Sequence, residues 1–248
     1  MRFNIRSHGA VLIYVAGAAL VAPGLSRAQA PDAKPPVVVE MFTSQACKQC
    51  PPAVELLGKL YKRPDLVVLN WHIDYWNLLS SGKHGRWRDP YSKPEYSERQ
   101  RVYNRNIRRR RTVFTPQAII DGATSVIGSK EEALEIQIRR ERAYLQPIAI
   151  DFTVEGGNLS VTIDKQGPDR ADVYFVSFHD WKETPVKGGD NAGLVFREPN
   201  IVAGMMRLGG LAYRAETFTV PAPEAGMGCA IIIQERDQGP ILGGRYCP

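Results

Sequence analysis

Cysteine is scarce in this chain, with four residues in 248, and histidine is equally rare. Cys47 and Cys50 form one C-x-x-C pair, and neither a second C-x-x-C nor an H-x-x-x-H follows it. A structural zinc ion usually takes four such ligands. The sequence therefore excludes a self-contained zinc module, although the single pair could still contribute to a metal site.

Long apolar runs are missing as well. The longest one covers residues 10–22, and its 13 residues are fewer than the roughly 20 that a transmembrane helix needs. Arginines precede this run and small residues follow it, which is the layout of a secretory signal peptide. We expect a signal over residues 1–30, cleaved near Ala28 or Ala30, and a periplasmic or secreted protein. An uncleaved signal that anchors the chain in the membrane is the alternative.

Excess charge is modest. Export would remove Arg2, Arg6 and Arg27 and lower the formal net charge from +6 to +3. A charge this small does not favour a nucleic-acid partner, and we expect none. Export would also place the four cysteines in a compartment where disulfides form and persist.

The apolar segments predict an α/β domain over residues 31–146. Strands are expected at residues 37–42, 66–73, 117–121 and 125–127, with helices from 53, over 94–107 and over 130–145. Residues 76–91 read as a loop, and Ser129 with Glu132 forms a capping box for the last helix. Parallel strands need helical connections of this kind.

After residue 147 the pattern changes to short strands separated by Gly, Pro, Asp and Asn. This pattern predicts a β-sandwich-like domain over residues 147–248, with at most a helical turn around 201–208. Cys229 and Cys247 lie symmetrically about a turn at residues 237–239. A hairpin there would place them opposite each other, and we expect a structural disulfide worth about 3 kcal/mol.

The Cys47–Cys50 pair lies between a predicted buried strand and the start of a helix. Free backbone N–H groups and the helix dipole favour a thiolate there, and can lower a cysteine pKa from about 8.5 to about 3.5–7.5. We expect Cys47 to be exposed and nucleophilic and Cys50 to resolve the mixed disulfide, with Lys48 lowering the thiol pKa further. A metal-binding pair and an inert structural disulfide are the alternatives.

Two polar residues end the predicted second strand. Asp74 could take the proton from Cys50 as a general base. His72 could do the same, or it could join Cys47 and Cys50 around copper or zinc. Both side chains could instead simply hydrogen-bond the loop backbone.

Arginine is concentrated in one stretch, where seven arginines lie within residues 99–111 and the last four are Arg108–Arg111. This run could attract phospholipid headgroups or an acidic partner. A solvated helix face and loop is the simpler interpretation.

Residues 42–52 resemble the signature of a bacterial family of secreted thioredoxin-like proteins, catalogued as a domain of unknown function. Residues 72–76, 115–117, 121–122 and 239–243 match it too. The resemblance implies a thioredoxin-like N-terminal domain and a β-rich C-terminal one. It also implies that Pro116 is the cis-proline that faces the C-x-x-C, and that Thr115 pairs its backbone with substrate. A plain trans proline at a strand start is equally allowed.

The sequence departs from that family where Ala46 replaces an expected glycine, where Lys48 and Gln49 replace small residues, and where residues 80–88 look inserted. We predict an exported thiol–disulfide oxidoreductase that acts on protein or small-molecule disulfides together with a redox partner. No dissociable cofactor is needed, because the dithiol carries the two electrons. The alternative is a metal-binding or ligand-binding module on a thioredoxin-like scaffold without redox turnover.

Overall fold

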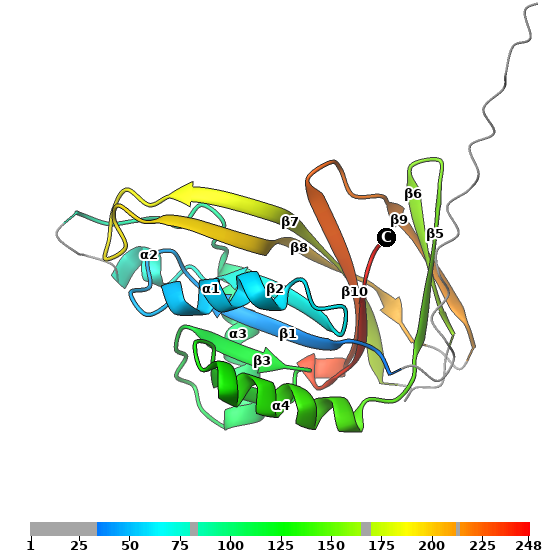
Figure 1. The fold of residues 1–248 in the computed structure, drawn as a ribbon. Helices are drawn as coiled ribbons and strands as arrows, with labels where there is room; N and C mark the ends of the chain where they lie inside the picture. The colour runs from blue at the N-terminus through cyan, green and yellow to red at the C-terminus, as the bar shows by residue number, and fades with distance from the viewer. Residues whose placement is uncertain (1–33, 80–83, 165–169, 212–213) are drawn as a thin grey trace, which may run out of the picture.

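The computed structural model describes residues 34–79, 84–164, 170–211 and 214–248 (Figure 1). The predicted signal over residues 1–30, with its cleavage sites near Ala28 and Ala30, lies outside them, as does part of the predicted insertion at 80–88. None of the described helices is long and apolar enough to cross a membrane.

The first half forms a three-layer α/β arrangement. Its elements are β1 (Val37–Thr43), α1 (Pro51–Leu60), β2 (Leu66–His72), α2 (Trp76–Leu79), α3 (Pro94–Arg108), β3 (Gln117–Ile120), β4 (Thr124–Ile127) and α4 (Glu131–Tyr144). Every residue of β1 and β2 is buried, as expected of parallel strands covered on both faces. Val39 and Met41 of β1 pack with α1 and α4, whereas Phe42 packs with α3 on the other face.

The strand order of this half is β2-β1-β3-β4, with β1 parallel to β2 and antiparallel to β3. The predicted α/β class and element order are therefore confirmed. Two local predictions are wrong. A short helix, α2, occupies part of the predicted loop, and Lys130 rather than Ser129 is the N-cap of α4, without a side-chain cap bond. Because α4 starts one residue late, Glu132 does not stand at the capping-box position.

The second half extends the same sheet. Its elements are β5 (Ala149–Glu155), β6 (Asn158–Asp164), β7 (Ala171–Pro185), β8 (Val195–Gly210), β9 (Glu216–Pro221), β10 (Met227–Glu235), η1 (Arg236–Gln238) and β11 (Ile241–Tyr246). The large sheet runs β11-β10-β7-β8-β2-β1-β3-β4, and β8 joins β2 where Ile201 pairs with Asn70. The helical turn predicted at 201–208 is wrong, because these residues pair with β7 along β8.

A second sheet, β5-β6-β9, packs against β7 and β10 through a core that includes Phe152, Val161, Val173 and Ile231. The residues after 147 are thus β-rich and sandwich-like. Part of this half nevertheless shares a sheet with β1 and β2, so the boundary between 146 and 147 stays a prediction. A disulfide joins Cys229 and Cys247 at the open end of the β10–β11 hairpin, with their Cα atoms 5.3 Å apart.

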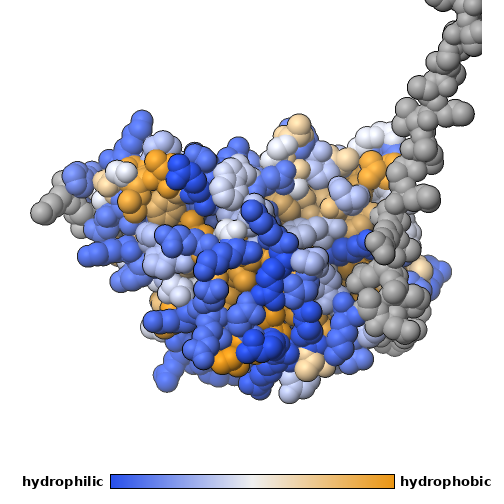
Figure 2. All heavy atoms as spheres, viewed as in Figure 1, coloured by the Kyte–Doolittle hydropathy of each residue, from blue (hydrophilic) through white to orange (hydrophobic). Residues whose placement is uncertain are grey.

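The strands β7 and β8 form a long arm. Figure 1 shows this arm running beside α1 toward the end of the molecule where α2 lies. Val186 and Phe196 from the arm pack on Val54 of α1, with Trp87 against them. Hydrophilic residues cover most of the face seen in Figure 2, and hydrophobic residues form separate patches on it.

Candidate functional site

The Cys47–Cys50 disulfide lies at the junction of β1 and α1. The two Cα atoms are 5.4 Å apart, and Cys50 is the N-cap of α1. The carbonyl of Cys50 accepts the backbone N–H groups of Ala53 and Val54. Pro51 and Pro52 fill the first helical positions, where an N–H would have no partner in the helix. The local sequence thus places both sulfurs at a helix N-terminus, as predicted.

Both cysteines are completely buried, with 0% of either residue exposed. The prediction of an exposed Cys47 is therefore wrong, although Lys48 and Gln49 between the cysteines are exposed. Thr115 contributes to this cover, since its hydroxyl lies 3.2 Å from Cys47 Sγ. The Trp76 indole N–H donates to the same hydroxyl at 2.6 Å.

The peptide bond between Thr115 and Pro116 is cis. The resemblance implied this geometry, and sequence position alone left it open. Pro116 precedes β3, the strand that pairs with β1, and the contact between Thr115 and Cys47 brings this segment against the disulfide. The structure therefore brings together four of the predicted site residues: Cys47, Cys50, Thr115 and Pro116.

The turn at the end of the β7–β8 arm, residues 186–194, is called the arm tip below. It contacts the cysteine loop, which comprises residues 44–50 between β1 and α1. Asn191 is 4% exposed, and its side-chain N–H groups donate to the carbonyls of Gln45 and Cys47, both at 2.9 Å. Gly189 N–H donates to the carbonyl of Gly85 at 2.9 Å. A Cβ on Gly188 would lie 2.6 Å from the Arg86 carbonyl oxygen, so only glycine permits this approach.

A buried charged cluster lies beside the cysteine loop. His72 Nδ1 is 2.8 Å from Asp89 Oδ2, and His72 Nε2 is 3.2 Å from Glu198 Oε1. Burial disfavours a charged imidazole, but the two carboxylates outweigh burial and raise the pKa of His72 to about 10. Burial likewise acts to raise the pKa of Asp89, but His72 outweighs it and lowers that pKa. At neutral pH the cluster therefore holds an imidazolium between two carboxylates.

Gln45 links this cluster to the disulfide. Its backbone N–H donates to Asp89 Oδ2, and its side-chain amide donates to Glu198 Oε2, both at 2.8 Å. The Trp87 indole N–H donates to Gln45 Oε1 at 3.3 Å. Because Gln45 precedes Cys47 by two residues, the charged cluster fixes the backbone from which the cysteine loop begins.

The other predicted roles at this site lack such contacts. Both ring nitrogens of His72 are engaged with carboxylates, and no group of three or more His, Cys, Asp or Glu in the described parts of the chain is placed to hold a metal ion. The structure thus does not bring His72 together with both cysteines as a ligand set. The Asp74 carboxylate accepts the Ser97 hydroxyl of α3, and within the described residues no hydrogen bond joins it to Cys50.

A second buried ion pair connects the two halves of the sheet. The Glu40 carboxylate of β1 accepts Arg99 Nε at 2.7 Å and Nη2 at 3.0 Å, and the Tyr103 hydroxyl donates to it as well. Gln234 of β10 accepts Arg99 Nη2 at 3.1 Å. Burial disfavours the Arg99 charge, but Glu40 outweighs burial and raises its pKa. Arg99 is therefore a core residue, not part of a solvated arginine face.

Sequence reasoning missed Asp89, Asn191 and Glu198. Glu198 stands in a polar stretch, residues 197–200, whose composition was unusual for a strand but indicated no partner. Asn191 lies between glycines in the arm tip, which reads as an ordinary turn. Asn191 and Glu198 carry no local signal for the site, because each reaches it through the pairing of β7, β8 and β2.

These features define an α/β protein in which a buried C-x-x-C disulfide lies between a parallel strand and a helix, against a cis-proline segment and a hairpin arm. The chain belongs to the family described as "Protein of unknown function (DUF1223)", whose profile matches residues 38–234. The predicted membership of a family of unknown function is thus confirmed.

The solved structures that resemble this chain include two of different origin. Protein AGR_C_4864 from Agrobacterium tumefaciens has a TM-score of 0.71 and 28% identity, over 85% of this chain and 92% of that one. HBP35 of Porphyromonas gingivalis has a TM-score of 0.57 and 13% identity, over 86% and 75% of the two chains, a likeness of fold alone. No curated protein matches this chain.

Proposed function

We propose that this protein is an exported thiol–disulfide oxidoreductase whose reacting group is the Cys47–Cys50 pair. The observation that carries the proposal is the Thr115 hydroxyl, 3.2 Å from Cys47 Sγ, on the residue that precedes a cis-proline. The strand order β2-β1-β3-β4, with the disulfide at the N-terminus of α1, supports it as the arrangement expected of a thioredoxin-like protein. Export rests on the signal predicted in residues 1–30.

The exchange proceeds in two steps. A substrate thiolate attacks Cys47 Sγ, a mixed disulfide forms, and Cys50 leaves as a thiolate at the helix N-terminus. A second substrate thiolate then attacks the substrate sulfur of the mixed disulfide and releases Cys47. The substrate dithiol becomes a disulfide, and the protein gains two electrons and two protons. The same steps in reverse reduce a substrate disulfide.

Access to the sulfurs requires motion, because neither cysteine is exposed. The arm tip is the segment best placed to move. It has glycines at 188, 189 and 193, and two of them adopt positive φ, +70° at Gly189 and +89° at Gly193. Two Asn191 hydrogen bonds join it to the cysteine loop in the described part of the chain. We therefore include displacement of the arm tip by the substrate as a step that precedes exchange.

The charged cluster has a positioning role in this proposal. His72, Asp89 and Glu198 do not contact the sulfurs through any described hydrogen bond. Asp89 holds the backbone of Gln45 and Glu198 holds its side chain, while His72 lies between the two carboxylates. Since the Gln45 carbonyl also accepts a hydrogen bond from the Asn191 side chain, one residue joins the cluster, the cysteine loop and the arm tip. The cluster therefore sets the geometry from which Cys47 reacts.

The test is dithiothreitol-dependent reduction of insulin by the full chain. We expect the wild type to exceed the Cys47→Ser variant at least about tenfold, since in this direction the Cys47 thiolate, reduced by dithiothreitol, attacks the insulin disulfide. A double variant, Cys229→Ala with Cys247→Ala, is the matched control because it removes a disulfide of similar Cα separation elsewhere. A wild type no faster than Cys47→Ser in both reduction and oxidation assays would overturn the proposal.

A further inference from the structure

The end of α3 and the loop after it form the most basic stretch of the described chain near the disulfide. Residues 96–120 contain seven arginines and one acidic residue, Glu98. Arg99 is neutralised in the core by Glu40, and Glu98 pairs with Arg101 at 3.5 Å and with Arg105 at 2.8 Å. One charge of the Arg101 and Arg105 pair is left over, and the other four uncompensated charges belong to Arg108–Arg111, which we call the basic turn.

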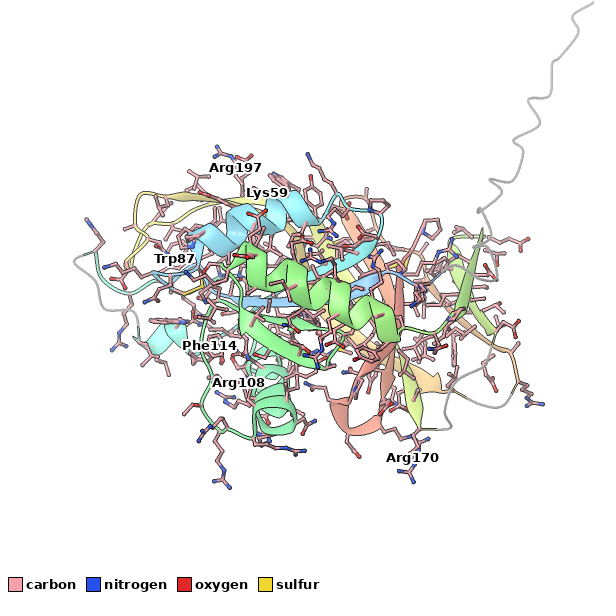
Figure 3. All side chains as sticks on the ribbon, turned by 60° about the horizontal axis from the view of Figure 1, so that its bottom comes forward. Lys59, Trp87, Arg108, Phe114, Arg170 and Arg197 are labelled. Carbon is pink, nitrogen blue, oxygen red and sulfur yellow. A yellow bond between two sulfur atoms is a disulfide. The ribbon has the colours of Figure 1, made fainter. Side chains whose placement is uncertain are left out.

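The backbone of the basic turn is well defined. Helix α3 ends at Arg108, Arg109 adopts a left-handed conformation with φ of 54°, and Arg110 N–H donates to the Asn104 carbonyl at 3.1 Å. The Arg108 guanidinium donates to Asn104 Oδ1 at 2.6 Å and stacks on Phe114 at 4.8 Å from the ring centroid (Figure 3). Arg108 thus serves the structure of the turn.

The side chains of the next three arginines extend into solvent instead of packing on the turn. Arg109, Arg110 and Arg111 are exposed, and within the described residues no carboxylate or hydrogen-bond acceptor pairs with their guanidinium groups. Favourable interaction with the C-terminal dipole of α3 accounts for basic residues in its last turn, but that effect fades beyond it. Three unpaired positive charges in a row repel one another, so an internal structural role does not explain them.

The basic turn is close along the chain to Thr115, the residue that contacts the disulfide. Arg111 precedes Thr115 by four residues, so their Cα atoms are at most about 14 Å apart. The intervening loop is held in place, because Gln100 Nε2 donates to the Phe114 carbonyl at 2.8 Å. Thr115 in turn contacts Cys47 Sγ. A polypeptide whose cysteine reaches Cys47 would pass within side-chain reach of these guanidinium groups.

We propose that Arg109, Arg110 and Arg111 bind carboxylates of the substrate protein, so that the preferred substrate cysteine has acidic residues three to five positions away. This inference rests on the proposed function and names its substrate class. An extended chain advances about 3.3 Å per residue, so three to five residues span about 10–17 Å, enough to cover the separation of at most about 14 Å between the Cα atoms of Thr115 and Arg111. Guanidinium groups pair with carboxylates through two parallel hydrogen bonds. An acidic polypeptide fits better than a lipid surface, because the arginines lead directly into the segment that contacts the disulfide.

The test compares the second-order rate constants at which the oxidised full chain reacts, in a single turnover, with dithiol peptides that differ only at these positions, with Glu or with Gln. At low ionic strength we expect the Glu peptide to react about tenfold faster, and the preference to fall to about twofold or less at 0.5 M salt, roughly where the Debye length nears 4 Å. The variant Arg109→Gln, Arg110→Gln, Arg111→Gln should lose the preference.

The matched control is Lys130→Gln, Arg139→Gln, Arg140→Gln, which removes the same charge from exposed positions of α4 across the sheet. It should keep the tenfold preference. Equal rates of the wild type with the Glu and Gln peptides would overturn this inference while leaving the proposed function intact. Binding of anionic vesicles by the wild type but not by the arginine variant, without a peptide preference, would overturn it in favour of a membrane role. No turnover of any peptide would remove the proposed function itself.

Discussion

The side-chain amide of Asn191 donates a hydrogen bond to the carbonyl of Cys47 at 2.9 Å, between residues that are 144 positions apart. This bond joins the tip of a β-hairpin from the second half of the chain to the C-x-x-C loop of the first. Together with the bond to the Gln45 carbonyl, it holds the arm tip against a disulfide that has no exposed surface. The disulfide is thus part of the core in this arrangement.

Replacing Asn191 with alanine should make the Cys47–Cys50 disulfide easier to reduce. Two hydrogen bonds are lost, each worth about 1 kcal/mol, so the population with a displaced tip should rise about 30-fold. The measurement is the rate at which dithiothreitol exposes thiols to an alkylating reagent, with Cys47 and Cys50 identified by mass.

Asn106→Ala is the matched control for that experiment. Asn106 is an exposed asparagine whose side chain also donates to two backbone carbonyls, those of Asp237 and Gln238. Its loss should leave the reduction rate unchanged. If Asn191→Ala is reduced no faster than Asn106→Ala, the tip does not control access.

His72→Gln should strongly destabilise the fold. The substitution removes the positive charge between Asp89 and Glu198, and breaking a buried ion pair in this way costs about 3–5 kcal/mol. Urea unfolding measures the effect. A second change, Glu198→Gln, removes one of the two facing carboxylates and should recover part of the loss. His84→Gln changes an exposed histidine and should alter the free energy of unfolding by less than about 0.5 kcal/mol. A similar small effect for His72→Gln would show that the cluster is not charged.

Asp121 should make stability fall as pH rises. Its Oδ1 accepts the Val38 N–H at 2.6 Å, and its Oδ2 is buried without a partner in the described structure. Burial raises the pKa of this carboxyl from 3.8 to about 8. The folded state then binds a proton that the unfolded state has released, so this contribution is complete below pH 3.8 and is lost as pH rises through about 8.

Asp121→Asn removes that titration and keeps the acceptor for Val38. We expect the variant to gain stability relative to the wild type as pH is raised from 4 to 8, in urea unfolding at each pH. Asp190→Asn, at an exposed position of the arm tip, is the matched control. A constant difference for Asp121→Asn would mean that Asp121 is ionised throughout this range.

Removing the Cys229–Cys247 disulfide should affect stability and leave exchange chemistry intact. The bond closes a loop with a sequence separation of 18, for which the chain-entropy model gives about 3 kcal/mol. Denaturant unfolding of the double alanine variant measures this loss, and the insulin assay below the unfolding transition should match the wild type. Loss of activity in the folded variant would mean that the second pair takes part in the reaction.

Much of the fold follows from local sequence. The β-branched run of β1, the C-x-x-C, two prolines and an apolar helical pattern specify a strand, a turn and a helix within 24 residues, from Val37 to Leu60. The symmetric spacing of Cys229 and Cys247 about a turn likewise predicts their opposition across the β10–β11 hairpin. Each of these features depends on neighbours along the chain, which a sequence displays directly.

Local sequence does not predict the structure correctly where pairing between distant strands decides it. Residues 201–208 suggest a helical turn, but pairing with β7 makes them part of a strand. Glu198 reaches His72 only because β8 lies beside β2, where Ile201 pairs with Asn70. Asp89 arrives from the loop before α3. No periodicity or spacing relates these three residues, so their cluster could not be predicted from the sequence.

The sequence by itself thus determined where the C-x-x-C lies, at the junction of a buried strand and a helix, because backbone hydrogen bonding and proline restrict those few residues locally. The tertiary structure alone decided that the disulfide is covered and that a buried histidine between two carboxylates fixes the loop before it. The covered disulfide and the charged cluster both depend on the β7–β8 arm. Its strand β8 pairs with β2, which lies more than 120 residues earlier in the chain. That pairing is selected by burial of the whole sheet, which no single segment encodes.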